Sequence, residues 1–90
     1  MSGNMQGMDV AEVDRIGRQL RTEAENVSQL LARVAKQVDV ADRAWEGKDA
    51  ERFVADWRTK RAQLQTIQTQ LNQLGQKAIN EAAQQRRTSG

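Results

Sequence analysis

The stretch WEGKDAERFVADW, residues 45–57, lies in the middle of this 90-residue chain and decides its fold. Gly47 can adopt the left-handed backbone conformation that closes a helix, and Asp49 can cap a second helix that begins there. The sequence therefore predicts a turn at residues 46–48, with one long helix before it and another after it.

Apolar residues recur every three or four positions on both sides of this turn, which is the period of an amphipathic helix. If the chain folds back at the turn, facing residues have numbers with a nearly constant sum, and the two stripes match along their length. The pattern predicts an all-α antiparallel helix-turn-helix hairpin. The predicted hairpin and dimer core comprises Val13, Ile16, Leu20, Val27, Leu31, Val34, Val38, Phe53, Trp57, Leu64, Ile67, Leu71 and Leu74.

The ends of the helices also carry recognisable signals. Asp9 can cap the first helix, and Glu12 stands where it would complete a capping box. Gly17 and Gly75 are expected to weaken the helices by about 1 kcal/mol each relative to Ala. The expected organisation is a disordered N-terminus over 1–8, a hairpin over 9–85 with helices at about 9–45 and 49–85, and a flexible tail over 86–90.

Further apolar residues lie beside the two main stripes, at Leu30, Val40, Val54 and Ile79. They widen the apolar arc beyond what a single facing helix can cover. Two hairpins packed together as a four-helix bundle would complete the burial, so the sequence predicts a dimer. The alternative is an exposed scattering of apolar residues, which is common on protein surfaces.

The composition excludes most catalytic chemistry. The chain has no Cys, His or Tyr, so it offers no thiol, imidazole or phenol for catalysis and no thiolate or imidazole for a metal. No two carboxylates lie where a core pocket would raise a pKa. The sequence therefore predicts no enzymatic activity, no metal and no cofactor.

The charge pattern argues against nucleic acid and membrane partners. The net charge of +2 is the difference between 14 basic and 12 acidic residues, and acidic residues interrupt the basic ones. Asp14 precedes Arg18 by four residues, as in ordinary helix-surface pairs. No apolar stretch approaches the roughly 20 residues that span a bilayer, and the N-terminus lacks the features of a cleavable signal peptide. We therefore expect no nucleic-acid binding and no stable membrane insertion.

The central stretch also carries a family pattern: Trp45 and Gly47 in the turn, then Ala50 and Phe53 three residues apart, then Trp57. This pattern, together with the chain length and the central turn, resembles the WXG family of small ESAT-like helical hairpins exported by bacterial type VII (ESX-type) secretion. The resemblance covers essentially the whole chain. It implies a dimer with itself or with a paralogous WXG-type protein. It also implies recognition by the secretion ATPase and secretion from a cytoplasmic folded pool without a cleavable signal peptide.

The resemblance further implies that Trp45 and Gly47 form half of a composite export signal. In the family, the other half is a Tyr-Xaa-Xaa-Xaa-Asp/Glu motif near the C-terminus of the partner chain, and this sequence contains no Tyr. Either a heterodimer partner supplies the missing half, or another feature within residues 81–87 replaces it in a homodimer. The alternative functions are an intracellular helical adaptor or targeting module that is not itself secreted, and a small DNA-associated bundle.

Overall fold

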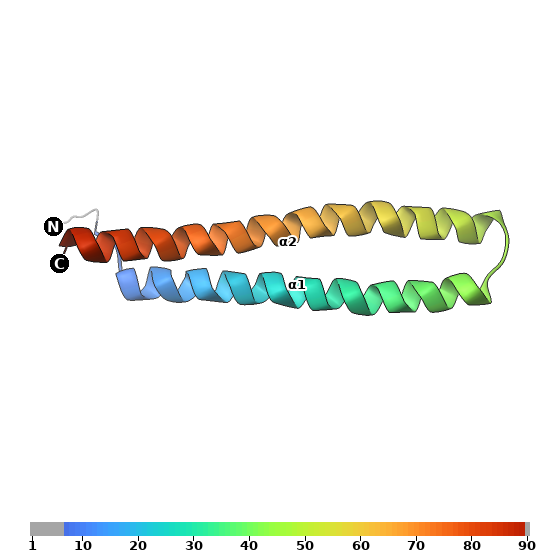
Figure 1. The fold of residues 1–90 in the computed structure, drawn as a ribbon, viewed down its shortest axis with the longest axis horizontal. Coiled ribbons are helices and arrows are strands. Elements are labelled where there is room, and N and C mark those ends of the chain that lie inside the picture. The colour runs from blue at the N-terminus through green and yellow to red at the C-terminus, as the bar shows by residue number, and fades with distance from the viewer. Residues whose placement is uncertain (1–6, 90) are drawn as a thin grey trace. The chain divides into compact units, whose positions relative to one another are not determined.

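The computed structural model describes residues 7–89, and two helices contain nearly all of them. Helix α1 spans Val10–Ala44 and α2 spans Lys48–Ser89, joined by a short turn (Figure 1). No strand occurs within residues 7–89. The predicted all-α helical hairpin is therefore confirmed.

Helix α1 begins with the predicted cap. The Asp9 carboxylate oxygen Oδ1 accepts a hydrogen bond from the backbone N–H of Glu12 at 3.0 Å, and the Asp9 carbonyl accepts one from Val13 at 2.9 Å. The Glu12 side chain accepts a hydrogen bond from Arg15 in the next turn, so the structure shows one of the two bonds of the predicted capping box, from the Glu12 N–H to Asp9. The cap satisfies N–H groups that have no partner inside the helix.

The start of α2 differs from the prediction by one residue. Because α2 begins at Lys48, Asp49 lies inside the first turn of the helix and is not its cap. Its negative charge there interacts favourably with the positive end of the helix dipole. Gly47 stands directly before the helix with a φ of 103°. Its carbonyl oxygen accepts the backbone hydrogen bond of Glu51 at 3.2 Å. Gly47 thus both reverses the chain and starts α2.

The end of α2 extends further than expected. Residues 86–89 are helical, where the sequence analysis predicted a flexible tail. The Thr88 hydroxyl donates a hydrogen bond to the Gln84 carbonyl at 2.9 Å. The positive charges of two arginines in the last turn interact favourably with the negative end of the helix dipole. Residues 1–6, most of the predicted disordered N-terminus, lie outside the described residues.

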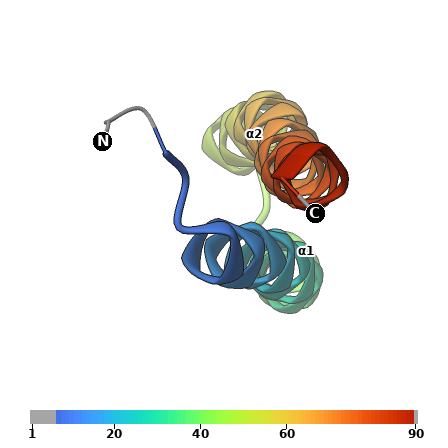
Figure 2. The same ribbon diagram turned by 90° about the vertical axis from the view of Figure 1, so that its left-hand side faces the viewer.

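The chain divides into two compact units, each built from part of α1 and part of α2. The turn unit spans Ala24–Thr69 and includes the connection between the helices. The terminal unit combines the described residues up to Glu23 with those from Gln70 onward, and Figure 2 looks onto this end. Within each unit the α2 segment runs antiparallel to the α1 segment, because a single turn joins the two helices.

Small side chains dominate the core of both units. The buried apolar residues are Ala24, Leu31, Val38, Ala50 and Ala82, and none of the large side chains in the described part of the chain is fully buried. On α1 the buried positions from Gly17 to Val38 are seven residues apart, the spacing of a coiled-coil seam. Small residues on such a seam allow two helices to approach closely.

The closest approach occurs between two glycines in the terminal unit. A Cβ atom placed on Gly17 would lie 2.7 Å from the carbonyl oxygen of Gly75, and one placed on Gly75 would lie 2.5 Å from that of Gly17. Beside this contact the Arg21 guanidinium donates a hydrogen bond to the Gln76 side-chain oxygen at 2.9 Å. The glycines expected to weaken the helices are therefore required for packing, because any side chain would push the backbones apart.

Replacing Gly75 with Ala should lower the stability of the fold, although Ala favours a helix interior by about 1 kcal/mol over Gly. The added Cβ would meet two backbone atoms, the Gly17 oxygen and the Arg21 nitrogen, which cannot rotate away. Overpacking of this kind costs about 1–3 kcal/mol. We expect a lower midpoint of thermal unfolding, measured by circular dichroism at fixed protein concentration.

The matched control is Ala55→Gly at an exposed position of α2. This change alters helix propensity alone and should destabilise by about 1 kcal/mol. A higher unfolding midpoint for Gly75→Ala than for the wild type would show that propensity dominates and that the backbones are not in contact.

Candidate functional site

The described residues offer no constellation for catalysis or for metal binding. No group of three or more acidic residues within them is arranged to hold a metal ion. A hydrogen bond from Arg15 lowers the pKa of Glu12, and one from Arg18 lowers the pKa of Asp14. These are exposed pairs within one helix, and they favour the charged carboxylate, whereas a general acid needs a raised pKa. Neither described helix has an apolar segment long enough to cross a membrane.

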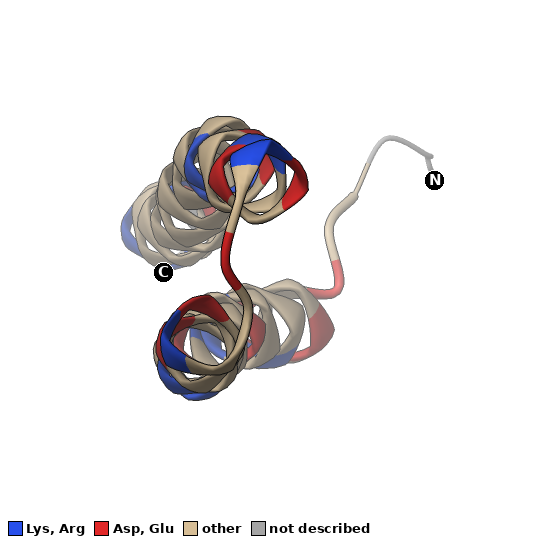
Figure 3. Cartoon of the chain, turned by 90° about the vertical axis from the view of Figure 1, so that its right-hand side faces the viewer, with Lys and Arg blue, Asp and Glu red and all other residues tan. Residues whose placement is uncertain are grey.

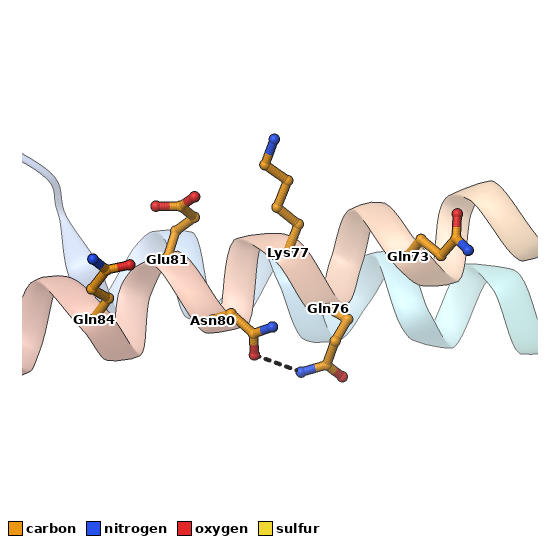
Figure 4. A pocket seen from close by; sticks show the side chains of 6 residues that line it. All are labelled: Gln73, Gln76, Lys77, Asn80, Glu81 and Gln84. Carbon is orange, nitrogen blue, oxygen red and sulfur yellow. Dashed lines mark hydrogen bonds between the residues drawn. The ribbon is translucent and has the colours of Figure 1, made fainter.

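A shallow pocket on α2 is polar and is formed by one helix alone. Figure 4 shows its lining residues, and Gln76 donates a hydrogen bond to the side-chain oxygen of Asn80 at 2.9 Å. Gln76 also accepts the bond from Arg21 of α1, so this network ties the two helices of the terminal unit together. The other lining side chains, Gln73, Lys77, Glu81 and Gln84, are exposed.

The turn itself presents an unusual surface. Trp45 follows the last residue of α1 and lies in neither helix, and 44% of its surface is exposed. Apart from the atoms of Gly47 and its two chain neighbours, no heavy atom lies within 4 Å of the position that a Cβ atom on Gly47 would take. Acidic and basic residues are mixed on the ribbon around the turn (Figure 3). The turn therefore displays a partly exposed indole next to open space. The charged residues around the turn are of both signs.

The indole of Trp45 contacts the ring of Phe53, with ring centroids 5.6 Å apart and ring planes tilted by 49°. Phe53 is 41% exposed, although the sequence analysis placed it in the hairpin core. The α2 positions that turn towards α1 here are the buried Ala50 and the half-buried Val54 and Trp57. Phe53 lies beside this row, which leaves its ring available to the turn.

The other predicted core residues separate into three groups. Leu31 and Val38 are buried. Six are half-buried: Val13, Leu20, Val27, Val34, Trp57 and Leu71. Four, in addition to Phe53, are exposed: Ile16, Leu64, Ile67 and Leu74. The hairpin therefore leaves much of the predicted core without cover.

Most of these exposed residues share one spacing. Ile16 and Leu30 on α1, and Phe53, Ile67 and Leu74 on α2, are separated within each helix by seven residues or by twice that number. Positions at this spacing stay on one side of a coiled-coil helix. Each helix thus carries one exposed apolar row, distinct from the seam that faces the other helix.

In the turn unit both rows lie on the same side of the helix pair. Leu30 directly precedes the buried Leu31 on α1, and Phe53 directly precedes the half-buried Val54 on α2. An antiparallel helix pair has an approximate two-fold axis perpendicular to the helices, which keeps such residues on one side. We call Leu30 and Ile67 the apolar flank of the turn unit; Phe53 follows the same row but lies next to the turn, in contact with Trp45.

The terminal unit repeats this arrangement. Ile16 directly precedes Gly17 and Leu74 directly precedes Gly75, so both large apolar side chains lie on one side of the glycine contact. The sequence analysis assigned these residues to the seam between the helices. The strict seven-residue spacing of the small residues Gly17 and Ala24 with Leu31 is the signal that separates the seam from the flank.

Comparison with known proteins gives a match over nearly the whole chain. The family model described as "WXG100: Proteins of 100 residues with WXG" matches residues 7–88. Among solved structures, Geobacillus thermodenitrificans EsxA, crystal form I, is similar, with a TM-score of 0.84, 28% sequence identity and 89% of each chain covered. A search of curated proteins finds no match. The chain therefore belongs to the WXG100 family, the small helical hairpins of type VII secretion.

Proposed function

We propose that the folded turn of this type VII secretion substrate displays Trp45 and Gly47 as part of the signal for its export. The observation that carries the proposal is the exposure of the turn. Trp45 stands outside both helices with 44% of its surface accessible, and the space around Gly47 is open. Large aromatic side chains of this kind are the residues that most often dominate the energy of a protein interface.

The signal would depend on folding, because the turn exists only when both helices are formed. Gly47 has a φ of 103°, which an L-amino acid with a side chain adopts at a cost of about 1–2 kcal/mol. Its carbonyl oxygen begins the hydrogen bonding of α2 through Glu51. A secretion ATPase that recognises this surface would therefore select folded chains.

The partner in this proposal is a second WXG100 chain that covers the apolar flank. Ile67 is 48% exposed and Leu30 is 49% exposed, and burial of a Leu or Ile side chain contributes about 1.5–3 kcal/mol. A hairpin whose buried core consists largely of alanines gains little stability from its own packing. A second hairpin would remove the exposed row from water and form a four-helix bundle.

The lack of Tyr bears on which WXG100 chain this partner is. A family-type C-terminal Tyr motif cannot come from this sequence, because the chain contains no Tyr. We infer that this chain is the subunit of a heterodimer that lacks this motif, and that a paralogous partner supplies it. In the homodimer alternative, residues 81–87, which form part of α2, would replace the motif.

Replacement of Trp45 by Ala should reduce export roughly tenfold or more, since an interface Trp commonly contributes at least about 2 kcal/mol. The measurement is the ratio of the protein in culture supernatant to that in cells, in the organism that encodes the chain. Trp57→Phe is the control, because Trp57 is half-buried on the seam between the helices. Normal export of a folded Trp45→Ala protein would exclude the turn as a signal, and absence of the wild-type protein from the supernatant would favour an intracellular adaptor.

Replacement of Ile67 by Asp should abolish dimer formation while the helix content stays unchanged. A carboxylate without a partner in an apolar interface costs several kcal/mol, whereas the same group on an exposed hairpin surface costs little. Val40→Asp is the matched control, because Val40 is 58% exposed in the same unit and lies outside the apolar flank. Light scattering of each variant mixed with the WXG100 partner should give no complex for Ile67→Asp and a one-to-one complex for Val40→Asp, and the reverse result would place the partner on another face.

Light scattering of the wild-type chain, alone and with the product of a neighbouring WXG-type gene, identifies the partner. We expect a one-to-one complex on mixing, because the partner supplies both the cover for the flank and the missing motif. A stable dimer of the chain alone would instead support the homodimer with an export feature in residues 81–87. A monomer under both conditions would contradict the dimer proposal.

A further inference from the structure

Phe53 is the residue whose ring contacts the Trp45 indole. Trp45 stands after the last residue of α1 and before the first residue of α2. Its indole lies against the ring of Phe53 at a centroid distance of 5.6 Å and a tilt of 49°. This geometry falls within the range of favourable aromatic pairs.

Phe53, in contrast, has a rigid base. It lies in the second turn of α2, one helical turn after Ala50, which is only 3% exposed. The buried Ala50 shows that this part of α2 packs closely within the turn unit. Phe53 can therefore hold an aromatic partner in place, whereas Trp45 depends on such a partner for a defined orientation.

The exposure of the two rings points to a role beyond hairpin stability. Trp45 and Phe53 keep 44% and 41% of their surfaces accessible, so their contact buries only part of each ring. A purely structural aromatic pair would be expected to be turned inwards. Here the contact leaves 44% of the Trp45 surface open to solvent.

We propose that Phe53 is a positioning residue of the export signal, holding the Trp45 indole in the orientation that the secretion machinery recognises. This inference rests on the proposed function of the turn. Aromatic contacts of this kind favour the paired arrangement about 2- to 10-fold. Loss of the ring at residue 53 therefore makes the recognised orientation rarer by the same factor, without removing the indole itself.

The orientation can be measured in a Trp57→Phe background. The wild-type chain has two tryptophans, and this substitution leaves Trp45 as the single fluorescent indole. Phe53→Ala should make the fluorescence of Trp45 more sensitive to quenching by acrylamide, because the indole loses its neighbour. Phe53→Tyr should restore the wild-type value, because it keeps the ring and places its hydroxyl at a partly exposed position. Unchanged quenching in Phe53→Ala would overturn the positioning role.

The export assay then separates this role from the proposed function itself. We expect export of Phe53→Ala to fall about 2- to 10-fold, with wild-type export for Phe53→Tyr and for Val40→Ala, which removes a more accessible apolar side chain elsewhere in the turn unit. Reduced export of Trp45→Ala with normal export of Phe53→Ala would overturn this inference alone. Normal export of both variants would overturn the export signal as well.

Phe53 lies in the same row as the apolar flank, so a role in the dimer must be tested alongside. The mass of the assembly that the wild-type chain forms should be retained in Phe53→Ala, measured by light scattering under the same conditions. A monomer mass for this variant, as expected for Ile67→Asp, would assign Phe53 to the dimer interface and overturn the positioning role.

Discussion

A helix that packs against only one other helix can bury only a narrow seam, and this limit governs the structure described here. The seam includes two glycines in the terminal unit and alanines in both units, which let the backbones approach but contribute little apolar area. Several of the large apolar residues stand in a second row beside the seam. The apolar residues are thus divided between the contact within the hairpin and its surface. A hairpin of this kind cannot cover all of its apolar residues by itself.

The same division explains what could be predicted from the sequence. The cap at Asp9 and the turn at Gly47 depend on neighbouring residues, and the sequence identified both. The role of Gly75 depends on Gly17, which is distant in the chain. The role of Phe53 depends on whether residue 53 or its neighbour Val54 faces α1, and a pattern read as an average period of three to four residues does not separate these two positions. The helical end of α2 was missed because polar residues with no apolar stripe can still continue a helix through local hydrogen bonds, as Thr88 does.

In the proposed function, the turn acts by being recognised. For this it needs a defined shape at the point where the backbone reverses. Gly47 provides the reversal, and Trp45 provides a large, partly exposed side chain outside both helices. Family membership and the local geometry both support this proposal, and under it the missing Tyr makes recognition depend on a second chain.

The contact between Gly17 and Gly75 also determines the alignment of the two helices. A seven-residue repeat is ambiguous, because sliding one helix by seven residues would keep its seam facing the other. A slip in one direction would place Ala82 opposite Gly17 and Ala24 opposite Gly75, and a slip in the other would place Gln68 opposite Gly17 and Val10 opposite Gly75. Either one brings a side chain to a point where the backbones leave no room. The two glycines therefore fix the register of the two helices. They allow one alignment of an otherwise repetitive seam and exclude its neighbours.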